Sequence, residues 1–259
     1  MSLKKKEFKN YNILIIGDSC VDRFIYGDVL RLAPEGPIPI FNPNSESSNA
    51  GMSGNVGRNI EAMGSKVHLI SNKIQPIKTR YVDERSGQLM IRIDENDKVD
   101  RIEKSLLKQI QNNQFFERNF DSIIISDYNK GFLLEEDIKY ICDNNKNVFI
   151  DTKKEFGEWI LNSSFIKINH VEYGLTKKNI EKLNLIDKLI ITLSSSGCMY
   201  KSKTYPVDPV SVKDVSGAGD TFLSGLVLEY LRTKSIEKAI LFAQKCATVV
   251  VQKRGVCTI

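Results

Sequence analysis

The sequence is poor in the residues that most often build metal centres and disulfide frameworks. Its 259 residues hold two histidines, His68 and His170, and five cysteines, none of them in a C-x-x-C pair. This composition disfavours a histidine-based metal site and a disulfide-stapled fold. An odd number of scattered cysteines is typical of reduced thiols, and we therefore expect a cytoplasmic protein.

Long apolar runs are missing as well. No stretch approaches the roughly 20 residues that a membrane-spanning helix needs, and the N-terminal residues lack the apolar core of a signal peptide. The net charge of +5 is mild, and the basic cluster Lys4, Lys5 and Lys6 is interpreted as a solvated tail. We expect neither a membrane nor a nucleic acid as partner, whereas a mild positive charge suits a phosphorylated small molecule.

What the sequence does contain is a regular alternation of short apolar runs with helical patterns. This alternation is typical of a largely parallel sheet covered by helices. The apolar runs that predict strands are 12–16, 66–71, 122–126, 148–151, 165–169 and 189–192, and residues 55–63 predict a helix. Each run ends in polar residues, and ligands bind at the carboxyl ends of parallel strands. The candidates at that edge are Asp18, Asp127, Asp151, Asn169 and Thr192.

Two segments break this rhythm, residues 24–41 and residues 79–94. Both alternate apolar with polar residues and contain turn residues. Such a pattern is typical of antiparallel strands that are exposed on one face. We predict that the two segments form a small β lid, although a pair of edge hairpins without a role at the site would give the same pattern.

The segment from Asp214 to Gly225 is the strongest signal of chemistry. Gly217, Ala218, Gly219 and Asp220 precede an apolar stripe of helical spacing, so small residues stand at a helix start. Free amides in a first helical turn favour a bound anion, as phosphoryl transfer requires. A carboxylate beside that cradle can accept the proton of an attacking hydroxyl. Taken alone, the same residues could form a glycine-rich turn that merely begins a helix.

This segment resembles the C-terminal signature of the PfkB carbohydrate kinases, and the chain resembles that family along nearly its whole length. The resemblance implies an α/β, ribokinase-like three-layer fold with a mostly parallel central sheet and a small β lid. It implies one kinase domain over residues 1–259, in which an alcohol group accepts a phosphoryl group. ATP and Mg²⁺ are the implied cofactors. Asp220 is the implied catalytic base, next to Gly217, Ala218 and Gly219.

Four stretches resemble the heptose kinases of lipopolysaccharide-precursor synthesis more closely. They are Gly17 to Asp28, Arg31 to Ile40, Ser126 to Gly131, and Asp151 to Lys153. This closer resemblance implies that the acceptor is the anomeric hydroxyl of D-glycero-D-manno-heptose 7-phosphate. Some of these kinases carry a fused nucleotidyltransferase with an H-x-G-H motif, which these residues do not contain.

The resemblance also assigns residues to ATP. The sequence Asn169, His170, Val171, Glu172 is similar to the family's N-x-x-E, which binds ATP phosphates and, through water, Mg²⁺. An amide can donate to phosphate and a carboxylate suits a hydrated hard cation. The pattern is short, and an asparagine before a helix-start glutamate would match it too. Thr192 and Gly197 fall where the family contacts the nucleotide, although Thr192 could equally be a strand-end hydroxyl bonded to the backbone.

On the acceptor side, Asp22 falls where the family binds sugar hydroxyls, with the cap of a turn as the alternative. Gly51 and Asn55 fall on the N-terminal glycine motif that lines the sugar pocket. Cations that could bind a substrate phosphate are Arg80, Lys130 and Lys153, although exposed cations are usually solvated.

Two departures from the family concern the acceptor half. Met52 stands where a second glycine is usual, and only six residues separate Ser71 from Lys78, where a helix-and-strand unit is usual. A kinase for another sugar or sugar phosphate, and a non-catalytic sugar-phosphate or nucleotide sensor, therefore stay open as alternatives. The apolar residues of the lid predict a homodimer that pairs through the lid.

Overall fold

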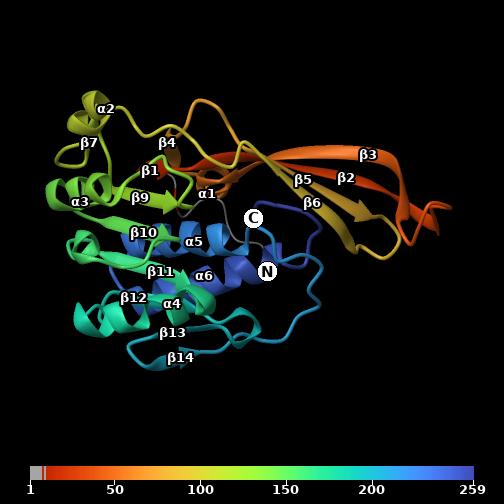
Figure 1. Ribbon diagram of the computed structural model, residues 1–259. Coiled ribbons are helices and arrows are strands. Elements are labelled where there is room, and N and C mark those ends of the chain that lie inside the picture. Colours follow the sequence, from red (N-terminus) through yellow and green to blue (C-terminus); the bar gives the residue numbers. More distant parts are fainter. Residues whose placement is uncertain (1–7, 9) are drawn as a thin grey trace.

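The structure of the chain is a computed structural model that describes residue 8 and residues 10–259. It consists of a body built on an eight-stranded sheet and a lid built on a four-stranded sheet (Figure 1). The predicted solvated tail, Lys4 to Lys6, lies outside the described residues. No helix within the described residues is long and apolar enough to cross a membrane.

The body sheet has the strand order β14-β13-β12-β11-β10-β9-β1-β4, and its strands from β12 to β4 run parallel. In this sheet β13 pairs in the antiparallel direction with both β12 and β14. The strands are β1 (Asn12–Gly17), β4 (Lys66–Ile70), β9 (Ser122–Asp127), β10 (Val148–Thr152), β11 (Phe165–Asn169), β12 (Leu189–Thr192), β13 (Cys198–Tyr200) and β14 (Lys203–Tyr205). The mostly parallel sheet predicted from the apolar runs is confirmed.

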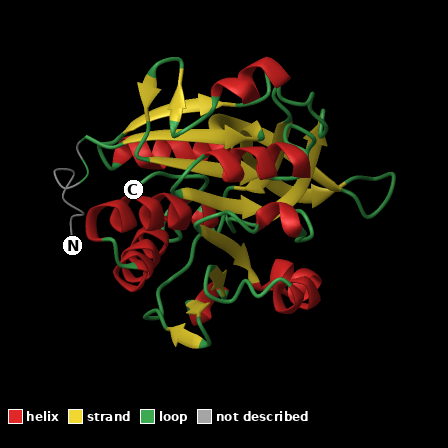
Figure 2. Cartoon of the chain, turned by 90° about the vertical axis from the view of Figure 1, so that its left-hand side faces the viewer, coloured by secondary structure: helices red, strands yellow, loops and turns green. Residues whose placement is uncertain are grey.

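Helices cover both faces of this sheet, which makes three layers (Figure 2). One face carries α1 (Ser53–Ala62), α5 (Ala218–Thr233) and α6 (Ile236–Val250). The other carries α2 (Lys104–Gln109), α3 (Glu135–Asn144), α4 (His170–Lys182) and the short η1 (Glu158–Ile160). The remaining short elements are β7 (Gln114–Phe115), β8 (Arg118–Asn119) and η2 (Ser194–Ser196).

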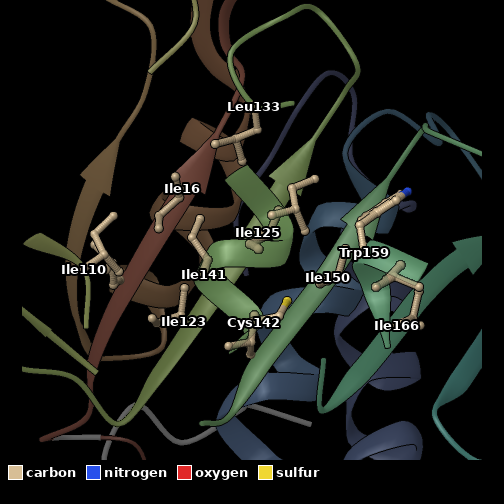
Figure 3. Close-up of a cluster of buried hydrophobic side chains, with 14 of the residues drawn as sticks. Ile16, Ile110, Ile123, Ile125, Leu133, Ile141, Cys142, Ile150, Trp159 and Ile166 are labelled. Carbon is tan, nitrogen blue, oxygen red and sulfur yellow. The ribbon is translucent and has the colours of Figure 1, made fainter. Parts of the chain in front are cut away.

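Alternation along the central strands separates two buried apolar clusters. Within β1, Leu14 and Ile16 pack on the α3 side of the sheet, whereas Ile13 and Ile15 pack on the α5 side. Figure 3 shows the first cluster, in which isoleucines of β1, β9, β10 and β11 meet α3 and Trp159. Each fully buried isoleucine stabilises the fold by about 1.5–3 kcal/mol. This rigid sheet fixes the strand ends from which the candidate site is built.

The lid is a sheet of order β3-β2-β5-β6 (Figure 1). Its strands are β2 (Ser19–Leu32), β3 (Pro39–Met52), β5 (Ile77–Asp83) and β6 (Leu89–Glu95). They extend beyond the predicted segments 24–41 and 79–94, because the polar stretch 42–52 pairs with β2 despite its loop-like composition. The hairpin pairs are antiparallel, but β2 and β5 pair in parallel.

The lid turns one face toward the body. In the register of β2 with β5, Asp22 lies beside Lys78 and Phe24 lies beside Arg80, so these side chains share a face. Asp22 and Phe24 are buried. The opposite face of β6 carries Ile91 and Ile93, which are 55% and 42% exposed. The inner face of the lid therefore carries charged side chains beside a buried phenylalanine, and the outer face exposes isoleucines of β6.

A short connection replaces the unit that is missing between β4 and β5. Asn72 is buried there and bonds both backbone groups of Ser19: its Oδ1 accepts from the amide at 2.8 Å and its Nδ2 donates to the carbonyl at 3.0 Å. The amide of Val21 donates to the carbonyl of Pro76 at 2.8 Å. One asparagine thus satisfies backbone groups at the start of β2 that would otherwise be buried without partners.

Candidate active site

The start of α5 forms a cradle of small residues at the carboxyl edge of the body sheet. Gly217 precedes the helix with φ 77°, a left-handed conformation that glycine adopts without strain. A β-carbon at Gly217 would lie 2.6 Å from Nδ2 of Asn55, and one at Gly219 would lie 2.9 Å from Nζ of Lys167. The amide of Ala218 donates to the carbonyl of Val215 at 3.2 Å, whereas the first-turn amides of Gly219 and Asp220 have no acceptor among the described residues. Backbone donors and a buried lysine therefore meet at one point, which favours an anion.

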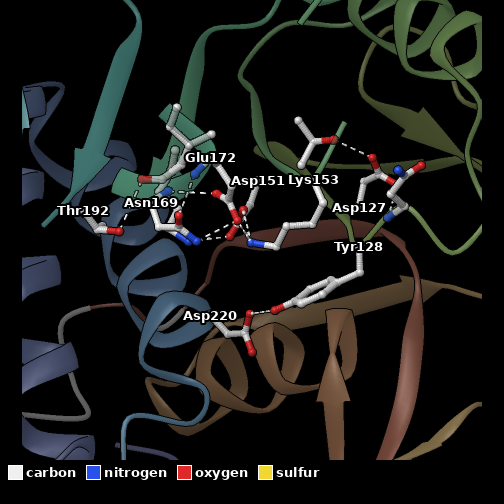
Figure 4. Close-up of polar contacts among 12 residues, drawn as sticks. Asp127, Tyr128, Asp151, Lys153, Asn169, Glu172, Thr192 and Asp220 are labelled. Carbon is white, nitrogen blue, oxygen red and sulfur yellow. Dashed lines mark hydrogen bonds and ion pairs between the residues drawn. The ribbon is translucent and has the colours of Figure 1, made fainter. Parts of the chain in front are cut away.

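Asp220 follows this cradle and is buried, at 5% exposure. Its two carboxylate oxygens are held separately: Nδ2 of Asn55 donates to Oδ2 at 2.9 Å, and the hydroxyl of Tyr128 donates to Oδ1 at 2.7 Å (Figure 4). Burial raises the pKa of Asp220 to about 6, although the two hydrogen bonds oppose the rise. At neutral pH the carboxylate is ionised and able to take a proton.

A buried ion pair lies beside the cradle. Lys167 of β11 donates to Oδ2 of Asp151, at the end of β10, over 2.6 Å, and both side chains are 4% exposed. Oδ1 of Asp151 is buried without a hydrogen-bond partner among the described residues. A buried, unsatisfied carboxylate oxygen is costly in a structure that never binds anything there. This atom therefore fits a site that receives a hydrated cation or another donor.

The N-x-x-E residues stand at the junction of β11 and α4. Oδ1 of Asn169 accepts the amide of Glu172 at 2.9 Å, and Oε2 of Glu172 accepts the amide of Asn169 at 2.8 Å. This reciprocal capping box is the structural alternative left open by the sequence, and it is present. Glu172 also pairs with Lys153, whose Nζ lies 4.0 Å from Oδ1 of Asp151 (Figure 4).

The other residues assigned to ATP lie around the same edge. His170 and Val171 begin α4 with exposed side chains. Thr192 ends β12 and its hydroxyl donates to the carbonyl of Ile168 at 3.3 Å, as the backbone-bonded alternative expects. Gly197 has φ 89°, and a β-carbon there would collide with the carbonyl oxygen of Tyr205. No hydrogen bond within the described residues joins these side chains to Asp220.

On the acceptor side, the structure brings Asp22 and Arg80 together. Nη1 of Arg80 donates to Oδ1 of Asp22 at 2.5 Å, and both side chains are largely buried. Gly51 lies on β3, the strand next to β2, and any β-carbon at Gly51 would collide with Oδ2 of Asp22. The glycine therefore makes room for the carboxylate that the sequence assigns to sugar binding.

The cations differ in how far acidic partners neutralise them. Lys130 pairs with Asp97, and its ammonium has no hydrogen bond or ion pair with the residues around Asp220 in the described part of the chain. Lys153 pairs with Glu172 and also lies 5.4 Å from the centre of the Tyr128 ring. Lys78 of the lid lies 5.7 Å from the same ring centre, is half-buried, and has no carboxylate within ion-pair distance among the described residues.

Tyr128, Lys167 and Lys78 were not among the residues predicted for the site. Lys167 carried a usable signal, because a lysine inside the apolar run of a central strand needs a buried partner. Tyr128 lies in the strand-end stretch Ser126 to Gly131, which resembles the heptose kinases, but no local pattern indicates that its hydroxyl reaches Asp220. Lys78 could be found only from the pairing of β5 with β2.

Met52 joins the lid to α1 in an unusual conformation. Its φ of 55° and ψ of −130° belong to a region that side chains other than glycine rarely occupy. The residue is 3% exposed and precedes the helix that carries Asn55. The backbone thus adopts a conformation that suits glycine better than methionine. Strain of this kind costs about 1–3 kcal/mol and collects at functional sites.

Solved structures of similar fold cover almost the entire chain. Ribokinase from Thermotoga maritima matches with a TM-score of 0.69 and 17% identity, over 95% of this chain and 94% of that one. Phosphofructokinase-2 from Escherichia coli matches with a TM-score of 0.69 and 13% identity, over 96% and 95% of the two chains. At these identities the likeness establishes the ribokinase-like fold.

Curated relatives are more similar in sequence. A protein of Helicobacter pylori strain J99 named "Bifunctional protein HldE" is 30% identical over 94% of this chain, and a protein of the same name from Nitratiruptor is 28% identical over 95%. The chain spans 63% and 62% of the length of these two relatives. The model of the "pfkB family carbohydrate kinase" family matches residues 63–259, a range that contains α5 and the N-x-x-E junction. The chain therefore belongs to the pfkB family of carbohydrate kinases.

Proposed function

We propose that the protein transfers the γ-phosphoryl group of ATP to the anomeric hydroxyl of D-glycero-D-manno-heptose 7-phosphate. The observation that carries this proposal is the buried carboxylate of Asp220, set directly after the cradle at the start of α5. The four stretches that resemble heptose kinases support the choice of acceptor. Family membership supports the class of reaction.

Asp220 acts as the general base. It accepts the proton of the acceptor hydroxyl while the hydroxyl oxygen bonds to the γ-phosphorus and the bond from phosphorus to the ADP oxygen breaks. Amides of the cradle, from Gly217, Ala218 and Gly219, stabilise the charge on the transferred group. The ammonium of Lys167 lies beside Gly219, but Asp151 largely offsets its charge.

The ATP site is proposed at the ends of β11 and β12. Asn169 binds phosphate and Glu172 binds Mg²⁺ through water, with His170, Val171, Thr192 and Gly197 along the nucleotide. No group of three or more potential metal ligands exists among the described residues, which suits a cation held largely by phosphate and water. The Lys153 ammonium already lies between Glu172 and Asp151, so this position favours positive charge. Bound Mg²⁺ neutralises charge on the phosphates.

The acceptor is proposed to lie under the lid. Asp22 accepts hydrogen bonds from sugar hydroxyls, and Gly51 and Asn55 line the same pocket. Arg80, Lys130 and Lys153 are the proposed partners of the substrate phosphate, and Lys78 is added to them because it lacks an acidic partner in the described chain. A lysine already paired with a carboxylate gains less from a phosphate than one that is not.

A kinase for a different sugar or sugar phosphate is the second candidate. Met52 and the short connection at residues 71–76 favour it, since both alter the acceptor side and leave the ATP side unchanged. A non-catalytic sensor fits less well, because a sensor has no need of a base held on both carboxylate oxygens.

Steady-state kinetics with heptose and with heptose 7-phosphate test the proposal. We expect the phosphorylated sugar to have the higher kcat/KM by roughly ten- to a hundred-fold, the effect of one charge-assisted contact. Nuclear magnetic resonance of the product identifies the phosphorylated oxygen. Equal kcat/KM for both sugars would eliminate the heptose 7-phosphate assignment, and turnover of another acceptor from a wider panel would support the second candidate.

A further inference from the structure

Tyr128 reaches the candidate base from a different layer of the molecule. It follows the last residue of β9, whereas Asp220 lies on α5, a helix that packs on one face of the sheet. Figure 4 shows the ring extending from the end of β9 to Asp220, where its hydroxyl donates to Oδ1 at 2.7 Å. Burial raises the pKa of this hydroxyl well above its usual value, so Tyr128 keeps its proton and acts as a donor.

The backbone of Tyr128 is held by a second buried carboxylate. Oδ2 of Asp18 accepts the amides of Tyr128 at 2.7 Å and Lys130 at 3.3 Å, and its Oδ1 accepts the amide of Phe132 at 3.3 Å. Asp18 is fully buried at the end of β1. Three amides on one carboxylate fix the loop 128–132 to the central strand, so the tyrosine ring has little freedom to move.

The hydroxyl of Tyr128 and the side-chain amide of Asn55 each donate a hydrogen bond to a different oxygen of the Asp220 carboxylate. One donor holds each oxygen, and the two donors come from the end of β9 and from α1. A carboxylate held at both ends cannot rotate, and each oxygen keeps a lone pair for a further donor. The acceptor hydroxyl of a substrate is that donor.

We propose that Tyr128 is a positioning residue that orients the carboxylate of Asp220 for proton transfer and holds it in its ionised form. This inference rests on the proposed role of Asp220 as base. Tyr128 itself exchanges no proton with the substrate. Asp18 supports it by fixing the loop from which the ring extends.

Several other charged groups lie near Asp220 and also affect its pKa. They must be considered before the effect of removing the Tyr128 hydroxyl on that pKa can be predicted. Asp151 of β10 raises the pKa of Asp220 and Lys167 of β11 lowers it. Lys153, after β10, and the Cys20 thiol of β2 also lie within electrostatic range. The Phe variant of Tyr128 leaves all of them in place and removes only a donor to the ionised form. The sign is therefore fixed: the pKa of Asp220 rises.

The experiment compares Tyr128→Phe with Tyr200→Phe. Tyr200 is a matched control, because it is buried on β13 and donates to the backbone carbonyl of Asp187 at 3.0 Å, away from the site. Carbon-13 aspartate titration by nuclear magnetic resonance, with Asp220→Asn to identify the signal, reports the carboxyl pKa without any turnover. We expect Tyr128→Phe to raise it by about one unit and Tyr200→Phe to leave it unchanged.

Activity gives the second readout. In Tyr128→Phe we expect the acid limb of kcat/KM to move to higher pH with the carboxyl, kcat at pH 8 to fall about ten- to a hundred-fold from lost orientation, and the KM for ATP to stay constant. If circular dichroism shows that this variant is misfolded, Tyr128→Leu replaces it; it too removes the hydroxyl donor and should shift the pKa of the carboxyl in the same direction. An unchanged Asp220 pKa in a folded variant overturns the proposal. An active Asp220→Asn enzyme would instead refute the base, and the titration distinguishes the two failures.

Discussion

Asp220 is buried, accepts hydrogen bonds from two donors and follows the cradle directly. A substitution can remove its ability to accept a proton while keeping its size and position. Asp220→Asn keeps the shape of the side chain and its contact with Tyr128, but it removes the proton acceptor. We expect turnover to fall by roughly 10²–10⁴-fold with ATP affinity nearly unchanged. In the wild type, activity should decline below about pH 6, where the carboxyl takes up a proton. A variant that retains more than about a tenth of the activity would rule out a base.

The conformation of Met52 allows backbone strain to be measured apart from side-chain burial. Met52→Ala and Met52→Gly both remove the buried side chain, but only glycine accepts φ 55° without cost. We therefore expect the glycine variant to be more stable than the alanine variant by about 1 kcal/mol, the reverse of the usual order beside a helix. Urea unfolding of the two proteins measures the difference. An alanine variant of equal or greater stability would show that the backbone is not strained.

Site residues could be predicted from the sequence where neighbouring residues form a recognisable motif. The glycines before Asp220 and the asparagine before Glu172 predict helix starts, and both helices begin at these positions. The contact of Tyr128 with Asp220 joins residues 92 positions apart. Such a contact depends on how β9 and α5 are placed by the whole core, which no local pattern encodes.

Among the elements, β5 carries Lys78, the cation whose substitution best tests the proposed binding of a substrate phosphate. Lys78 lies over the Tyr128 ring without an acidic partner in the described chain, whereas Lys73, five positions earlier, is 86% exposed and pairs with Glu103. We expect Lys78→Met to raise the KM for a sugar phosphate by about ten-fold or more while the KM for ATP is unchanged. Lys73→Met is the control and should behave as the wild type. Equal kinetics for the two variants would remove Lys78 from the acceptor site.

The lid contains a stretch of strand that the sequence did not predict. Central strands are apolar throughout because helices cover both faces, and they were located to within a residue or two. The stretch 42–52 is rich in asparagine and serine, which is typical of a loop, yet it forms half of a long hairpin. Pairing with β2 decides its conformation, because exposed strands need little apolar content of their own.

At the scale of the whole molecule, the outer face of the lid supports the proposed homodimer. Ile91 and Ile93 of β6 are 55% and 42% exposed on this face, and Leu32 and Ile38 at the lid tip are 60% and 59% exposed. A patch of this kind is more typical of an interface than of a surface in water. We expect light scattering to show a dimer at tens of micromolar protein and Ile91→Glu to yield a monomer. Leu241→Glu on α6, 48% exposed, is the control and should stay dimeric.

The way in which the chain passes between body and lid has a thermal consequence. Asp18 alone separates β1 from β2, and β3 runs into α1 without any linker, while short segments join β4 to β5 and β6 to α2. Because the chain connects the body and the lid at four places, the lid cannot detach at one connection on heating while the other three stay intact. Scanning calorimetry should therefore record a single endotherm whose van't Hoff and calorimetric enthalpies agree for the isolated protomer. Two resolved peaks would mean that the lid melts alone. With one peak, damage to the core and damage to the lid would lower the same melting temperature.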